Sequence, residues 1–131
     1  MPDRLMTNQA KKIELLHAAY AAFNARDIDA ALAVMTADVH WPRAFKGGVV
    51  HGPESVCAYW MEQWNEINPQ VEPVAFHLEE DGQVLVKVHQ VVRDLAGAVL
   101  ADEQVGHRFT LEHGLIQAME ICQLPASGFG T

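Results

Sequence analysis

The chain has 131 residues, half of them hydrophobic and a fifth charged, with a formal net charge of −8. This length fits one domain that buries a core of its own. The negative charge argues against nucleic acid and anionic lipid as partners, because both are bound through basic patches. We expect a single domain over residues 1–131, with its core over 8–122 and a short tail over 123–131.

Several features predict a cytoplasmic protein. No apolar run approaches the ~20 residues of a membrane-spanning helix, and residues 1–9 lack the apolar stretch of a signal peptide. The two cysteines, Cys57 and Cys122, lack C-x-x-C spacing and are typical of free thiols in a reducing compartment.

The first part of the chain predicts two helices. Thr7 or Asn8 can cap a helix whose apolar residues recur at helical spacing as far as Asn24. Asp27 can cap a second, short helix that carries apolar residues up to Met35. Both helices are therefore expected to bury one apolar face.

A short strand and a third helix follow. Residues 39–41 predict the strand, which Pro42 places at a sheet edge. The third helix starts at 52–54, where a proline and a carboxylate suit a first turn, and stops at 68–69. Tyr59 lies off its apolar stripe and is expected to be exposed. The stripe consists of Val56, Trp60, Trp64 and Ile67.

The remaining sequence alternates between apolar and polar residues and predicts a four-stranded antiparallel meander. The expected turns are three-residue loops at Gly82 and Gly114 and a turn at Ala96-Gly97. Each register pairs residues from the apolar side of one strand with residues from the apolar side of the next, so the apolar side chains share one face of the sheet. The expected pairs are Phe76 with Val86, Val86 with His107, Gln90 with Glu103, and His107 with Met119.

Three polar side chains fall on this apolar face: Gln90, Glu103 and His107. Burying polar groups is costly unless they are paired or used, so they predict a pocket. Glu103 and His107 lie about 13 Å apart along one strand, and either could act as a general acid or base. Two alternatives stay open: a Gln90–Glu103 hydrogen bond near the open end of the sheet, and a core His107 bonded to Tyr20 or to backbone.

Large aromatic residues supply candidates for the pocket walls. Trp41, Trp64 and Phe76 suit the walls, whereas Trp60 and Phe23 are expected in the core. The seven histidines show no metal-binding spacing, and no nucleophile elbow or phosphate loop is present. We therefore expect no metal and no cofactor.

The opposite sheet face mixes apolar and charged residues. Such a face suits a subunit interface, or it is a hydrated face of an antiparallel sheet. We expect a homodimer through this outer face, which is assigned Leu85, Lys87, His89, Val91, Arg93, Gln104, Arg108, Ile116, Ala118 and Cys122.

Four segments together resemble the nuclear transport factor 2-like superfamily, in its SnoaL-like and ketosteroid isomerase-like branches. They are YAAFNARDIDAAL at 20–32, MTADV at 35–39, VHGPE at 50–54 and HRFTLEHGLI at 107–116. The resemblance spans about residues 8–122. It implies an α+β fold: a cone-shaped barrel with three N-terminal helices packed on a curved antiparallel sheet, a deep pocket and often a dimer.

Aligning the functional residues of steroid isomerases with this sequence, one by one, weakens an isomerase assignment. The general-base carboxylate of steroid isomerases falls near Arg43, and the oxyanion tyrosine falls at Ala19, with Tyr20 one place along and pointing elsewhere. The second oxyanion group falls at His107. SnoaL-like cyclases use an acidic residue on the inner sheet face, a role open to Glu103 or His107.

The sequence thus predicts a pocket protein that binds or acts on a small, mostly apolar or aromatic molecule by cofactor-free acid–base chemistry. The alternatives are a non-catalytic binding or dimeric association module, and a structural dimer with an incidental cavity. The predicted catalytic residues are His107 and Glu103. Arg43, near the mouth, could attract an anionic group. The predicted ligand-binding residues are Gln90, Trp41, Arg43, Tyr20, Trp64, Phe76 and Met119.

Overall fold

The computed structural model describes residues 8–43 and 47–124, and in these ranges it contains three α-helices and six β-strands. None of the described helices is long and apolar enough to span a membrane. In chain order the elements are α2 (Asn8–Asn24), α3 (Ile28–Leu32), β1 (Met35–Pro42), β2 (Val49–His51), α4 (Pro53–Glu66), β3 (Ile67–Leu78), β4 (Val84–Asp94), β5 (Val99–Glu112) and β6 (Leu115–Cys122).

The strands form one mixed, mostly antiparallel sheet in the order β2-β1-β6-β5-β4-β3. The predicted meander, β3 to β6, is confirmed. The strand expected at 39–41 is longer and lies inside the sheet, because β1 pairs in parallel with β6 and antiparallel with β2. β2, which the sequence did not predict, occupies the edge instead. The second helix ends at Leu32, so Met35 belongs to β1 and not to a helix.

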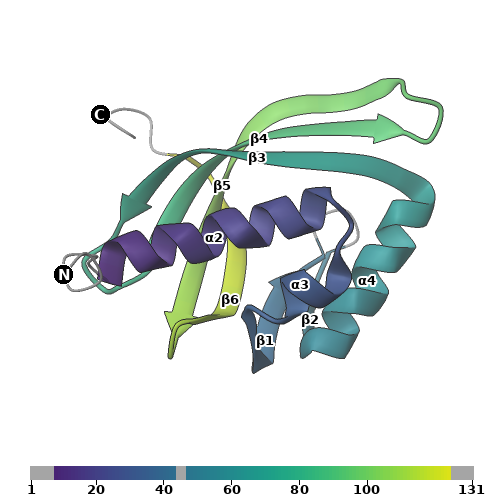
Figure 1. The fold of residues 1–131 in the computed structure, drawn as a ribbon. Coiled ribbons are helices and arrows are strands. Elements are labelled where there is room, and N and C mark those ends of the chain that lie inside the picture. The colour runs from purple at the N-terminus through teal and green to yellow at the C-terminus, as the bar shows by residue number, and fades with distance from the viewer. Residues whose placement is uncertain (1–7, 44–46, 125–131) are drawn as a thin grey trace.

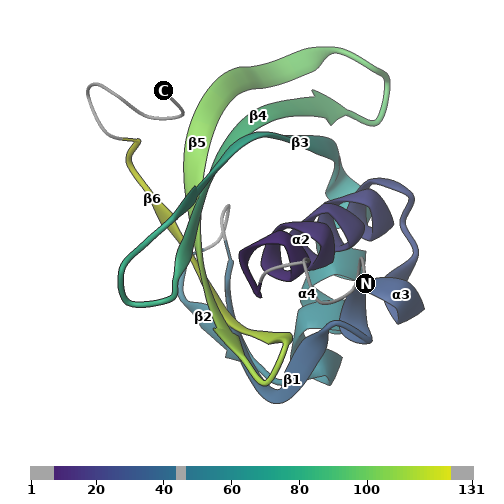
Figure 2. The ribbon, with the colours of Figure 1, turned by 60° about the vertical axis from the view of Figure 1, so that its left-hand side comes forward.

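The sheet curves around α2, which lies along its concave face, while α4 and α3 lie beside β1 and β2 (Figures 1 and 2). This is the expected α+β arrangement of three helices on a curved sheet. The core fills the space between helices and sheet, and its fully buried side chains include Leu16, Val39, Val56, Val84, Val86, Val88, Phe109 and Ile116.

The registers around β4 agree with the prediction. Val86 lies opposite both Phe76 and His107, and Gln90 lies opposite Glu103. These registers place His107 on the concave face, next to the helices.

The β5–β6 register differs from the prediction. The turn has two central residues with positive φ, His113 at 53° and Gly114 at 77°, which suits a two-residue hairpin loop. Such a loop alone would reverse the faces, but a bulge after Thr110 restores them. His107 therefore lies opposite Ile121, and Met119 opposite Phe109. Ile116 lies opposite Leu111, between the turn and the bulge, where the two-residue loop places it in the core, so its assignment to the outer face is wrong.

Two further expectations are corrected near α4. Tyr59 is buried, not exposed, because α4 packs between β1 and β3 and buries a wider face than the predicted stripe. β3 begins at Ile67, directly after the helix, although the sequence predicted a strand only around 74–78. Its first half forms part of the wall described next.

Candidate functional site

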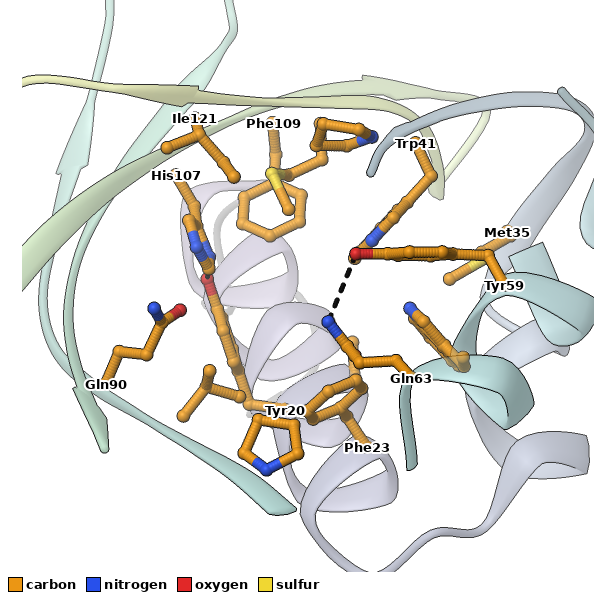
Figure 3. Close-up of a pocket in the computed structure, with 16 residues that line it drawn as sticks. Tyr20, Phe23, Met35, Trp41, Tyr59, Gln63, Gln90, His107, Phe109 and Ile121 are labelled. Atoms are coloured by element: carbon orange, nitrogen blue, oxygen red, sulfur yellow. Dashed lines mark hydrogen bonds between the residues drawn. The ribbon is translucent and has the colours of Figure 1, made fainter. Parts of the chain in front are cut away.

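A cavity of about 60 Å³ lies between α2, α4 and the concave face of the sheet. Most of its surface is apolar, as is usual for small-molecule sites. We call it the inner cavity. Its 16 lining residues are Ala19, Tyr20, Phe23, Met35, Trp41, Pro42, Tyr59, Trp60, Gln63, Pro69, Val71, Gln90, His107, Phe109, Met119 and Ile121 (Figure 3).

A buried hydrogen bond joins the helix to the sheet on one side of this cavity. The hydroxyl oxygen of Tyr20 on α2 lies 2.8 Å from Nδ1 of His107 on β5. The two rings are nearly parallel, and Phe109 meets each of them edge-on. Tyr20 is 6 % exposed and His107 5 % exposed. The pair is thus held by packing as well as by the hydrogen bond.

Burial keeps both members of the pair neutral. Desolvation lowers the pKa of His107 to about 4 and raises the pKa of the Tyr20 hydroxyl well above its ordinary value. A neutral imidazole has one donor and one acceptor nitrogen. When Tyr20 donates to Nδ1, the Nε2 of His107 carries the proton and can donate it. In the other tautomer Nδ1–H donates to the Tyr20 oxygen, and Nε2 has the free lone pair of a base. Among the described residues Nε2 has no hydrogen-bond partner, so it is available to a ligand.

A second polar pair lies on the opposite side of the cavity, on α4. Gln63 Nε2 donates to the hydroxyl oxygen of Tyr59 at 3.1 Å. Gln63 is 6 % exposed, and no described residue donates to its Oε1. Figure 3 shows Tyr59 and Gln63 on one side and Tyr20, His107 and Gln90 on the other. The cavity therefore has an apolar middle between two polar walls.

Five of the predicted site residues line this cavity, and four do not. The five are Tyr20, Trp41, Gln90, His107 and Met119. The expectation that Glu103 faces the pocket is corrected, because its side chain is exposed. The last β5–β6 pair is Gly106 with Cys122, so among the described residues Glu103 on β5 has no strand partner on that side.

The other three predicted residues lie outside the lining for different reasons. Trp64 packs behind it against Phe23 and Trp60, with the guanidinium of Arg26 above its ring. Phe76 contacts His17 on α2. Arg43 donates from Nε to the backbone oxygen of Gly47 at 2.8 Å.

The sequence also misplaced or missed several lining residues. Tyr20 points at His107 and not elsewhere, which corrects the carried-over geometry. Tyr59 and Gln63 had no predicted role, although their spacing of four residues puts them on one helix face. Trp60 and Phe23 are core residues, as predicted, but they also reach the cavity wall.

No group of three or more histidine, cysteine or acidic side chains is placed to hold a metal ion within the described ranges. None of the described residues that line the cavity is acidic. The titratable groups at the cavity are two tyrosines and one histidine. Proton transfer in the cavity would therefore depend on His107.

Comparison with known proteins identifies the family of this chain. The family model of the SnoaL-like domain matches residues 16–119. A separate search of curated proteins found no match.

Solved structures share the fold. TerC, co-crystallised with polyporic acid, is 27 % identical with a TM-score of 0.76, over 86 % of this chain and 91 % of TerC. A candidate polyketide cyclase from Xanthomonas campestris is 22 % identical with a TM-score of 0.72, over 88 % and 91 %. RV0760c from Mycobacterium tuberculosis, in complex with estradiol-17β-hemisuccinate, is 16 % identical with a TM-score of 0.72, over 83 % and 90 %.

Proposed function

Because this chain belongs to the SnoaL-like domain family, of the nuclear transport factor 2-like superfamily, we propose that its inner cavity binds a small, mostly apolar or aromatic molecule. We further propose that His107 transfers a proton to or from that molecule without a cofactor, in an isomerase-, cyclase- or dehydratase-like reaction. Family membership supports a small-molecule-binding or cyclase-like role. The ligand of TerC, polyporic acid, is a suitable first probe for binding.

The observation that carries the proposal is the buried Tyr20–His107 pair at an otherwise apolar wall. Buried ionisable groups are costly and cluster at functional sites. Tyr20 fixes the orientation of the imidazole through Nδ1, which leaves Nε2 for the ligand. Gln90 lines the same wall and would position a ligand oxygen near Nε2. Trp41 and Met119 would contact its apolar body.

A second candidate is a binding module without catalysis. One observation favours it: no acidic residue lines the cavity, so His107 has no carboxylate partner there. A lone neutral imidazole with a lowered pKa binds a polar group well but is a weak base. Both candidates predict ligand binding and differ only in proton transfer.

Proton exchange distinguishes the two candidates. The probe is 2-tetralone, an apolar bicyclic ketone, whose α-protons exchange with deuterium when a group removes them. We expect the protein to bind 2-tetralone and to accelerate exchange in D2O, measured by NMR. His107→Gln keeps a polar group beside Tyr20 but cannot transfer a proton at neutral pH, so binding should persist and exchange should stop.

The exposed His77 offers a matched control, and His77→Gln should behave as the wild type. Binding without accelerated exchange would favour the binding module. Equal exchange by wild type and His107→Gln would exclude the proposed role of His107. No binding of either 2-tetralone or polyporic acid would contradict the pocket function itself.

We also propose that the protein is a cytoplasmic homodimer. The cysteines Cys57 and Cys122 are both free thiols in the structure, which suits a reducing compartment. The outer sheet face carries half-buried apolar side chains, such as Val91, among charges, which suits an interface, although Leu85 is already buried within the chain.

A further inference from the structure

Gln63 has an unsatisfied hydrogen-bond acceptor in the wall of the inner cavity. Its side chain is 6 % exposed, yet Oε1 has no donor among the described residues. Leaving a buried polar atom unpaired is energetically costly. Natural proteins retain few such atoms, and each one calls for an explanation. Here the cavity supplies one, because Gln63 lines it.

The other end of the same amide is fixed. Nε2 donates to the hydroxyl oxygen of Tyr59 at 3.1 Å, one helical turn away on α4. This bond, dashed in Figure 3, orients the amide, and Oε1 is the atom left without a partner among the described residues. The remaining atom is a carbonyl oxygen, which accepts hydrogen bonds and cannot donate them. Its partner must therefore carry an O–H or N–H group.

Gln63 also lies at the boundary between the inner cavity and a second pocket. Tyr59 and Gln63 line the inner cavity and, with other residues, a second pocket of about 470 Å³. We call the second one the outer pocket. Its remaining lining residues are Glu66, Ile67, Val92, Leu100 and Ala101. The inner cavity alone is small, so a ligand that fills it and extends further passes Gln63.

From these three observations we propose that Gln63 is a specificity-determining residue that selects ligands bearing a hydroxyl group, by accepting a hydrogen bond from that hydroxyl at Oε1. The proposal rests on the proposed function and narrows its ligand class to apolar or aromatic alcohols and phenols. The hydroxyl would lie on the side of the cavity opposite His107.

A pair of probes that differ only in the donor tests this proposal. 2-Naphthol has an O–H, whereas 2-methoxynaphthalene has the same ring system and an oxygen without a proton. Binding of both to the full chain is measured by isothermal titration calorimetry. We expect the wild type to bind 2-naphthol about three- to tenfold more tightly, which is the effect of one net hydrogen bond.

Gln63→Met removes the acceptor with little change in volume, and we expect the preference for 2-naphthol to disappear. Binding of 2-methoxynaphthalene by this variant should persist, which shows that the cavity is intact. Gln63→Leu provides a second apolar variant should Gln63→Met not fold. The exposed Gln70 on β3 offers the matched control, and Gln70→Met should keep the wild-type preference.

The outcomes separate this inference from the proposed function. Equal binding of both probes by the wild type would overturn the role of Gln63 and leave the pocket function intact. A preference that persists in Gln63→Met and Gln63→Leu would also overturn it, because another group would then accept the bond. Failure of both probes to bind the wild type would overturn the apolar pocket function and this inference with it.

Discussion

The hydroxyl oxygen of Tyr20 lies 2.8 Å from Nδ1 of His107, although the two residues are 87 positions apart in the chain. The bond crosses from α2 to the concave face of the sheet, where both side chains are buried. It therefore belongs to the core and to the candidate site at once. Stability and ligand chemistry should both depend on it.

Tyr20→Phe should destabilise the protein by about 1–3 kcal/mol, because Nδ1 of His107 then loses its partner in a buried site. Urea unfolding followed by circular dichroism measures this change. The single variant His107→Leu and the double variant complete a thermodynamic cycle. We expect the double variant to lose about 1 kcal/mol less than the sum of the two single variants. Strict additivity would show that the hydrogen bond contributes nothing.

Stability should also fall in acid because of His107. Its pKa is about 4 in the folded protein, where burial disfavours the charged ring, and about 6.5 in the unfolded chain. Below pH 6.5 the unfolded state therefore binds a proton that the folded state does not. The free energy of unfolding should decrease between about pH 6.5 and 4, by on the order of 3 kcal/mol in total.

The comparison with His107→Gln isolates this contribution. Urea unfolding of both proteins at pH 7, 5.5 and 4 should show a steeper loss of stability in the wild type. Parallel losses in the two proteins would mean that other groups cause the acid sensitivity. A second measurement, NMR titration of the His107 ring protons, should show no protonation between pH 8 and 6.

Turn residues made the position of His107 predictable from the sequence. Gly82 and the Ala96-Gly97 turn fixed two registers, and the alternation of side chains fixed the face of every residue on β4 and β5. Because side chains alternate between the two faces along β4 and β5, a polar residue on the inward face can be recognised from the sequence alone. The resemblance to a known family added the cone shape, which alternation alone does not specify.

Other parts of the site depend on features that leave no local pattern. The two-residue turn at His113-Gly114 and the bulge after Thr110 together move the partner of His107 from Met119 to Ile121. A helix turns by about 100° per residue, so placing the oxyanion tyrosine at Ala19 instead of Tyr20 changes its assigned direction by more than a quarter of a turn. The alternation of side chains assigns Glu103 to the inner face of the sheet. However, it lies in a part of β5 that no described residue of β6 pairs with.

Asn24 at the end of α2 provides a test of how β3 is held against the cavity. Its Nδ2 donates to the backbone oxygen of Val71 at 2.7 Å, and its Oδ1 accepts from the Val71 amide at 2.9 Å. Asn24→Ala should lower the free energy of unfolding by about 1–3 kcal/mol and speed hydrogen exchange at the Val71 amide. Asn65→Ala, at an exposed position of α4, is the control. Unchanged exchange at Val71 would contradict this account.

The outer sheet face should form a homodimer interface. Arg108 is already paired with Glu79 at 2.8 Å, so the apolar side chains of this face, such as Val91, would contribute most of the attraction. We expect the wild type to sediment as a dimer at micromolar concentration and Val91→Asp as a monomer, because a carboxylate buried in an interface is costly. Val74→Asp, on the exposed edge strand β3, makes the same change elsewhere and should remain dimeric. A wild-type protein that sediments as a monomer would exclude this interface, and a dimeric Val91→Asp would place it on another surface.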